Sequence, residues 1–126
     1  MLDFKYAKMG VIVSIITILI LTVLEFPAPI GFEVRPQDNV SMWWLVLFLA
    51  ILISEIMAMF LIFKNPKLGA KFAIGAGILN ILQIFADQMH LMQPEIAPLG
   101  YTLLEYTVGI VSLVLIYLSW RVFELG

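Results

Sequence analysis

The sequence contains no cysteine and only one histidine in 126 residues. It can therefore form no disulfide, no thiolate metal site and no iron–sulfur cluster, and it has no thiol nucleophile. A single histidine also excludes a haem held by two histidines. Charged residues make up only 13% of the chain, against about 25% in a typical globular domain. So few charges cannot cover a folded chain with water-facing side chains, which excludes an ordinary soluble domain.

Apolar residues take the place of the missing charges: 63% of the chain is hydrophobic, and the mean hydropathy is +1.06. Four apolar runs approach or reach the roughly 20 residues that a helix needs to cross a bilayer. We predict an all-α integral membrane protein in which residues 1–126 form one domain with four spans, at about residues 8–25, 41–63, 68–91 and 101–121. The first run is interpreted as a retained span, because no small-x-small cleavage motif follows it.

The basic residues indicate how the spans are oriented. Six of the seven lie beside span ends on one side, and only Arg35 falls in a loop on the other side. By the positive-inside rule both termini and the turn FKNPK are cytoplasmic, in a plasma membrane of prokaryotic type. Because the connections are short, an antiparallel four-helix bundle is the simplest arrangement. The net charge of −2 argues against nucleic acid as a partner.

Each span carries one face of small and polar residues. Lipid provides no hydrophobic driving force between helices, so residues that allow close approach or hydrogen-bond across helices mark the faces that point into the bundle. In the third span this face is a stripe that begins at Gly69 and passes through Asn80 to His90. Each span also brings one carboxylate to its inward face, and these are Glu25, Glu55, Asp87 and Glu105.

Three of these carboxylates are predicted to lie in one layer near the outer surface. At about 1.5 Å per residue, Glu25, Asp87 and Glu105 each come out roughly 25 Å above the cytoplasmic basic residues, with His90 one turn further out. Carboxylates and one histidine in a helical bundle can hold a mononuclear divalent metal ion. A redox role with a quinone between the helices is a related hypothesis. The alternative is that these side chains are hydrated at the interface and partly neutralised by Arg35.

Glu55 is predicted to lie in a separate layer near the middle of the membrane. It comes out roughly 14 Å above the basic residues, level with Thr17, Ser112 and approximately Asn80. A charged carboxylate at this depth is costly, so we expect Glu55 to be protonated or hydrogen-bonded. Two interpretations stay open. Glu55 bridges helices through Asn80, Thr17 or Ser112, or it exchanges protons in a proton-coupled transporter of small molecules.

The segment ISEIMAMFLIFKNPKLGAKFAIGAGILNILQIFADQMHL combines the mid-span Glu55, a short basic turn with proline, and a third span rich in small residues. In these features it resembles the DoxX-like group of small four-helix membrane proteins, and the resemblance covers spans two to four. It implies an antiparallel four-helix bundle, and some members of that group are subunits of quinone-linked oxidoreductases. Small multidrug transporters are similar in length, but their essential membrane glutamate lies in the first span, where this chain has only Glu25 at the end.

These features predict an accessory or structural subunit of a larger membrane complex, with an oxidoreductase complex as one candidate. Its expected partners are the lipid bilayer and either other membrane subunits or further copies of the chain, and we do not expect it to be an enzyme on its own. The first alternative is a metal- or quinone-binding redox protein that uses Glu25, Asp87, His90 and Glu105. The second is a proton-coupled transporter centred on Glu55.

Overall fold

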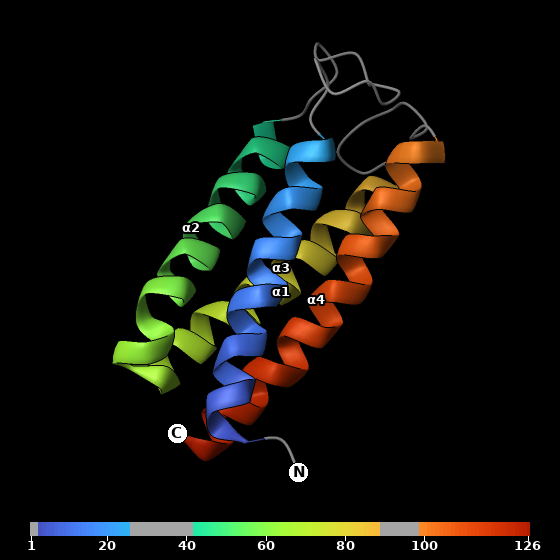
Figure 1. Cartoon of the computed structure of the whole chain (residues 1–126). Coiled ribbons are helices and arrows are strands. Elements are labelled where there is room, and N and C mark those ends of the chain that lie inside the picture. Colours follow the sequence, from blue (N-terminus) through green and yellow to red (C-terminus); the bar gives the residue numbers. More distant parts are fainter. Residues whose placement is uncertain (1–2, 26–41, 89–98) are drawn as a thin grey trace.

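The computed structural model describes the backbone of residues 3–25, 42–88 and 99–126, with the side chains of residues 3–23, 46–86 and 103–126. These parts form four α-helices, α1 (Phe4–Glu25), α2 (Met42–Lys64), α3 (Pro66–Gln88) and α4 (Leu99–Leu125). Successive helices run in opposite directions, and both termini lie at the same end as the turn between α2 and α3 (Figure 1). We call this the basic end, because it carries every lysine and arginine of the described residues: Lys5, Lys8, Lys64, Lys67, Lys71 and Arg121.

All four helices are long and apolar enough to cross a membrane. The qualifying segments are 19 to 23 residues long with hydropathies of 1.6 to 2.7, and they are Phe4–Val23, Val46–Lys64, Pro66–Ala86 and Leu103–Leu125. An α-helix suits such a sequence because it satisfies its backbone hydrogen bonds within one segment, as an apolar environment requires. The predicted all-α, four-helix architecture is therefore confirmed. The largest differences from the predicted spans are that α1 begins at Phe4 and that α4 continues to Leu125.

A single residue, Asn65, separates α2 from α3. The backbone N–H of Leu68 donates to Oδ1 of Asn65 over 3.4 Å, so Asn65 caps the start of α3. Pro66 occupies the first helical position, where its missing N–H costs nothing. One turn later, a Cβ added to Gly69 would lie 2.7 Å from the backbone nitrogen of Ile62. Glycine at this position thus lets the backbones of the two helices meet directly after the turn.

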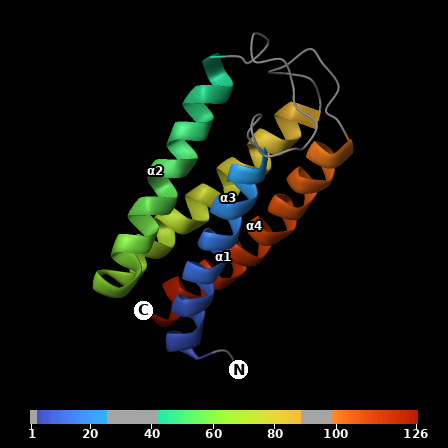
Figure 2. The same cartoon turned by 45° about the horizontal axis from the view of Figure 1, so that its top comes forward.

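The helices pack in the order α2, α3, α4, α1. Each consecutive pair in that order packs extensively, whereas α1 and α2 touch only slightly. They meet at the basic end, where the Lys8 ammonium lies 5.3 Å from the centroid of the Phe63 ring. Figure 2 shows α2 leaning away from α1 toward the opposite end. The bundle is antiparallel as predicted, and its α1–α2 side is more open than the sides formed by α2–α3, α3–α4 and α4–α1.

The inward faces follow the predicted pattern of small and polar residues. Glycines bring α4 close to its neighbours, because a Cβ on Gly77 would lie 2.6 Å from the Ile116 side chain and one on Gly10 would lie 2.7 Å from that of Leu118. Large apolar side chains dominate the outward faces, as expected for a surface that faces lipid. The buried apolar core draws on all four helices: Ala7, Val11, Ile15 and Ile18 of α1, Ala58 and Ile62 of α2, Ala70 and Ala73 of α3, and Val108, Leu115 and Val122 of α4.

Candidate functional site

A carboxyl group and a carboxamide meet inside the bundle between α2 and α3. Nδ2 of Asn80 donates a hydrogen bond of 3.2 Å to Oε1 of Glu55. Both side chains are almost fully enclosed, with 1% of Glu55 and 5% of Asn80 exposed. Of the three bridging partners considered for Glu55, the structure shows a hydrogen bond from Asn80.

Periodicity explains why these two side chains face each other. Ile51 and Ala58 lie one turn before and after Glu55 and are buried with it, and Ala76 is buried one turn before Asn80. The alanines keep the two helices close, so the longer polar side chains can span the remaining distance. In such apolar surroundings a hydrogen bond is strong when made, and an unpaired polar group is costly. The pair can therefore hold α2 against α3. Among the described residues, Glu55 is also the only side chain in the middle of these two helices that can take up or release a proton.

The structure does not join Thr17 or Ser112 to this pair. The Thr17 hydroxyl donates to the Val13 carbonyl of its own helix over 2.8 Å. Ser112 is fully buried, and its hydroxyl has no hydrogen-bond partner in the part of the chain that the structure describes. The four residues of the predicted middle layer thus contribute one interhelical hydrogen bond. Thr17 differs from the prediction because a threonine hydroxyl within a helix reaches the carbonyl four residues earlier more easily than a neighbouring helix.

The predicted outer layer lies mostly outside the described side chains. Glu25 and Asp87 belong to the last turns of α1 and α3, but only their backbones are described, and His90 is outside the described residues. Glu105 is buried, with 4% of its side chain exposed. Among the side chains that the structure describes, no three of the types His, Cys, Asp and Glu are close enough to share a metal ion. The metal site stays a prediction. The ends of α1, α3 and α4 that would contribute its ligands lie at the same end of the bundle, opposite the basic end (Figure 1).

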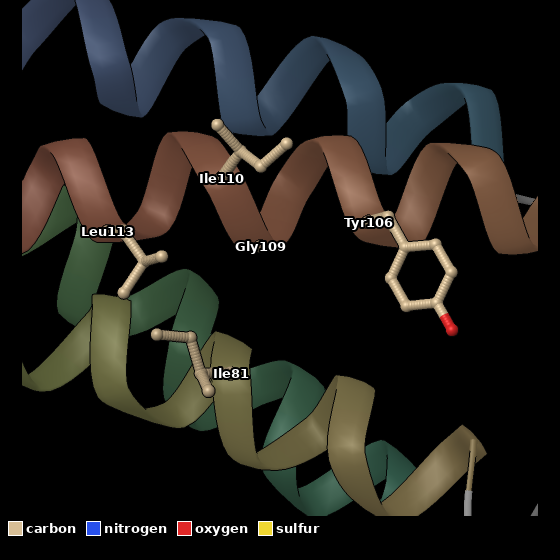
Figure 3. Close-up of a pocket in the computed structure, with 5 residues that line it drawn as sticks. All are labelled: Ile81, Tyr106, Gly109, Ile110 and Leu113. Atoms are coloured by element: carbon tan, nitrogen blue, oxygen red, sulfur yellow. The ribbon is translucent and has the colours of Figure 1, made fainter.

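An apolar groove of about 390 Å³ runs along the surface between α3 and α4. Ile81 lines it from α3, and four residues line it from α4: Tyr106, Gly109, Ile110 and Leu113. Figure 3 shows Leu113 and Ile81 on the two sides of the groove, with the Tyr106 ring further along the same side of α4. Gly109 lies on α4 within this lining. It is half-buried, and its missing side chain leaves part of the hollow.

Aromatic rings hold lysine side chains at the basic end. The Lys8 ammonium lies 4.2 Å from the Phe4 ring centroid, and those of Lys67 and Lys71 lie 5.6 and 5.9 Å from the Phe123 ring centroid. Phe123 also stacks on Trp120, with the two ring centroids 5.7 Å apart. Cation–π contacts of this kind connect α3 to α4 and hold the lysine side chains against the apolar surface.

The groove and the lysine–phenylalanine contacts were not predicted from the sequence. The four groove residues of α4 fall within eight consecutive positions and include the only glycine between Gly100 and Gly126. A glycine flanked by large side chains three and four residues away on one face of a helix is a signal for a surface hollow. The contact of Lys67 and Lys71 with Phe123 depends on how α3 and α4 pack, which no local pattern shows.

Comparisons with family models, with curated proteins and with solved structures found no match to this chain.

Proposed function

We propose that this chain is an integral membrane protein with the basic end on the cytoplasmic side of a prokaryotic-type plasma membrane. Four helices of spanning length support the insertion. All the lysine and arginine residues of the described parts lie at the basic end, which supports the orientation by the positive-inside rule.

Its proposed role is that of an accessory subunit that packs against other membrane proteins in a larger complex. The observation that carries this proposal is the open side of the bundle. Because α1 and α2 touch only slightly, each packs extensively against one helix, α4 or α3, and has a second flank with little contact. Half-buried apolar side chains belong to these flanks, among them Ile12 and Leu19 on α1 and Leu52 and Met59 on α2. A helix of a partner subunit placed between α1 and α2 would complete the packing.

The resemblance to the DoxX-like group narrows this proposal to a complex with quinone-linked oxidoreductase activity. In that role the chain would anchor or stabilise a catalytic subunit. The buried Glu55–Asn80 bond supports a structural role, because it fastens the α2–α3 pair internally and leaves the outward faces apolar for partner or lipid contact.

Extraction of the tagged protein from its native membrane in mild detergent tests this role. Native electrophoresis with mass spectrometry is expected to show one or more larger subunits in fixed stoichiometry with the chain. Leu52→Trp, on the open flank of α2, is expected to release them. Ile53→Trp is the matched control, because Ile53 is 59% exposed and lies about 100° further round the same helix. A chain that migrates alone or as a homodimer, in wild type and both variants, would contradict the accessory role.

A second candidate function is proton exchange at Glu55 in a transporter of small lipophilic molecules. What favours it is the position of a carboxyl group in the middle of α2 with a neutral amide as its hydrogen-bond partner. This function predicts that binding of a lipophilic cation dye to the purified protein depends on pH, and that Glu55→Gln removes the dependence. Dye binding that is the same in wild type and Glu55→Gln at every pH would exclude it.

A further inference from the structure

The face formed by α3 and α4 combines a charged end with an apolar groove. At the basic end, the Lys67 and Lys71 ammonium groups both approach the Phe123 ring, at 5.6 and 5.9 Å from its centroid. Further along the same two helices lies the groove between Ile81 and Leu113. The proposed accessory role uses neither of these two features.

Helical periodicity places these features on one continuous strip. At 100° per residue, Lys67, Ile74 and Ile81 fall within about 40° of one another on α3. On α4, Leu113 and Trp120 are seven residues apart and fall within about 20° of each other. Ile74 is half-buried and Trp120 is 51% exposed, so the strip between the lysines and the groove is an accessible apolar surface.

The length of the strip fits one leaflet of a bilayer. Lys71 and Ile81 are ten residues apart on α3, which corresponds to roughly 15 Å along the helix axis. Half of the hydrocarbon core of a bilayer is also about 15 Å thick. If a lipid headgroup lies at the lysines, the end of its acyl chain would therefore reach the groove.

The charge at the basic end of the strip is positive. Within the described residues neither Lys67 nor Lys71 forms an ion pair with a carboxylate side chain, and Glu124, which follows Phe123 on α4, is bound by Arg121 on its own helix, with 3.2 Å between Nη1 and Oε1. Two ammonium groups beside the same ring would attract the negatively charged phosphate of a lipid headgroup.

We propose that the α3–α4 face binds an anionic phospholipid, with its headgroup between Lys67 and Lys71 and one acyl chain in the groove at Ile81, Gly109 and Leu113. This inference rests on the proposed membrane insertion, but it does not depend on the accessory role. A lipid held here would cover the outward side of α3 and α4, so that the open flanks of α1 and α2 stay available to a protein partner.

Native mass spectrometry of the purified protein tests the proposal, with phosphatidylglycerol and phosphatidylcholine of equal chain length added in detergent. The wild type is expected to retain one phosphatidylglycerol about thirtyfold more strongly than phosphatidylcholine, which corresponds to two lysine contacts at the membrane surface. Lys67→Gln/Lys71→Gln is expected to lose this preference. Lys5→Gln/Lys64→Gln is the matched control, because it removes the same charge from exposed positions on α1 and α2 and should keep the preference.

A second pair of variants tests the acyl-chain site without changing any charge. Leu113→Trp fills the groove and is expected to weaken phosphatidylglycerol retention, whereas Val114→Trp, at an exposed position outside the groove lining, should not. Equal loss in both lysine pairs, or no preference in the wild type, would overturn the site. Displacement of the lipid by inorganic phosphate at millimolar concentration would show that a free anion, not a lipid, is bound. Failure of these tests would leave co-purification of larger subunits unaffected, so the two proposals can fail separately.

Discussion

Asn80 on α3 donates a 3.2 Å hydrogen bond to Glu55 on α2, and both side chains are buried between the two helices. This bond is a polar contact between two helices in the interior of the bundle. It explains how a carboxyl group is accommodated among apolar side chains, because the amide satisfies one of its oxygens.

Replacement of Glu55 separates hydrogen bonding from simple packing. Glu55→Gln keeps an oxygen that accepts from Asn80, so the free energy of unfolding is expected to change by no more than about 0.6 kcal/mol, the average value of an interhelical hydrogen bond in a membrane protein. Glu55→Leu leaves the buried amide unpaired and should lower the free energy of unfolding by about 1–3 kcal/mol. Unfolding in mixed detergent micelles measures both. In the control Glu55→Leu/Asn80→Leu much of the loss should be recovered, and equal stability of the Gln and Leu variants would disprove the bridging role.

Gly69 is predicted to be essential to the packing of α3 on α2. A Cβ at this position would lie 2.7 Å from the backbone nitrogen of Ile62 and 2.9 Å from the backbone carbon of Leu61, and backbone atoms cannot rotate away. Gly69→Ala should therefore lower the free energy of unfolding by about 1–3 kcal/mol, as overpacking does. The matched control is Gly75→Ala on the same helix, where an added Cβ meets nothing within 4 Å.

Gly75→Ala is expected to leave the stability unchanged or to raise it by up to about 1 kcal/mol, because alanine favours a helix more than glycine does. Thermal unfolding in detergent of the two alanine variants gives the comparison directly. Similar effects of both substitutions would mean that Gly69 acts only through helix propensity and that the α2–α3 backbones are not in close contact.

Ser112 provides a test of the same interior at a position without a hydrogen bond. Its hydroxyl is buried and has no partner within the described parts of the chain. Ser112→Ala should therefore be neutral or stabilise the protein by about 1 kcal/mol, since it removes an unsatisfied polar group. The unfolding free energy of this variant is measured beside that of Glu55→Leu. A loss of more than about 1 kcal/mol would show that the Ser112 hydroxyl makes a hydrogen bond in the membrane.

The absence of cysteine from the sequence makes the proposed orientation easy to measure. Single cysteines at Asn65 and Gly126, both at the basic end, are expected to react with a membrane-impermeant maleimide in inverted vesicles but not in intact cells. The reason is that the lysines and arginines of this end favour the cytoplasmic side. Labelling of either cysteine in intact cells would reverse the orientation and would place the basic end outside.

Much of the fold could be predicted because its causes are local. Hydropathy located the four helices. Small and polar residues marked the inward faces, because lipid provides no hydrophobic driving force between helices. Glu55 and Asn80 are each nine residues from a lysine, Lys64 or Lys71, and this spacing predicted that they lie at the same height. The order of the helices could not be predicted in this way. It depends on which glycines fit which side chains, such as Gly77 against Ile116, and such pairs leave no periodic signal.

The difference between local patterns and contacts that depend on packing also explains which parts of the candidate sites were predicted. The Glu55–Asn80 bond was accessible from the sequence, because both partners lie in long helices joined by a single residue, Asn65. Thr17 was predicted in the same layer, but its hydroxyl bonds within its own helix, which hydroxyl geometry decides and depth does not. The groove at Gly109 was missed because small residues are interpreted first as contact points between helices, and here one of them lines an outward hollow.

Site-specific photocrosslinking from the open side of the bundle tests the accessory role most directly. A photoreactive amino acid replaces Leu52 on the flank of α2 that faces α1, and in a second variant it replaces the outward Ile53. After irradiation in the native membrane, Leu52 is expected to crosslink to one larger polypeptide and Ile53 to lipid. Crosslinks from Leu52 that lead only to lipid, to α1 of the same chain or to a second copy would contradict the role as an accessory subunit.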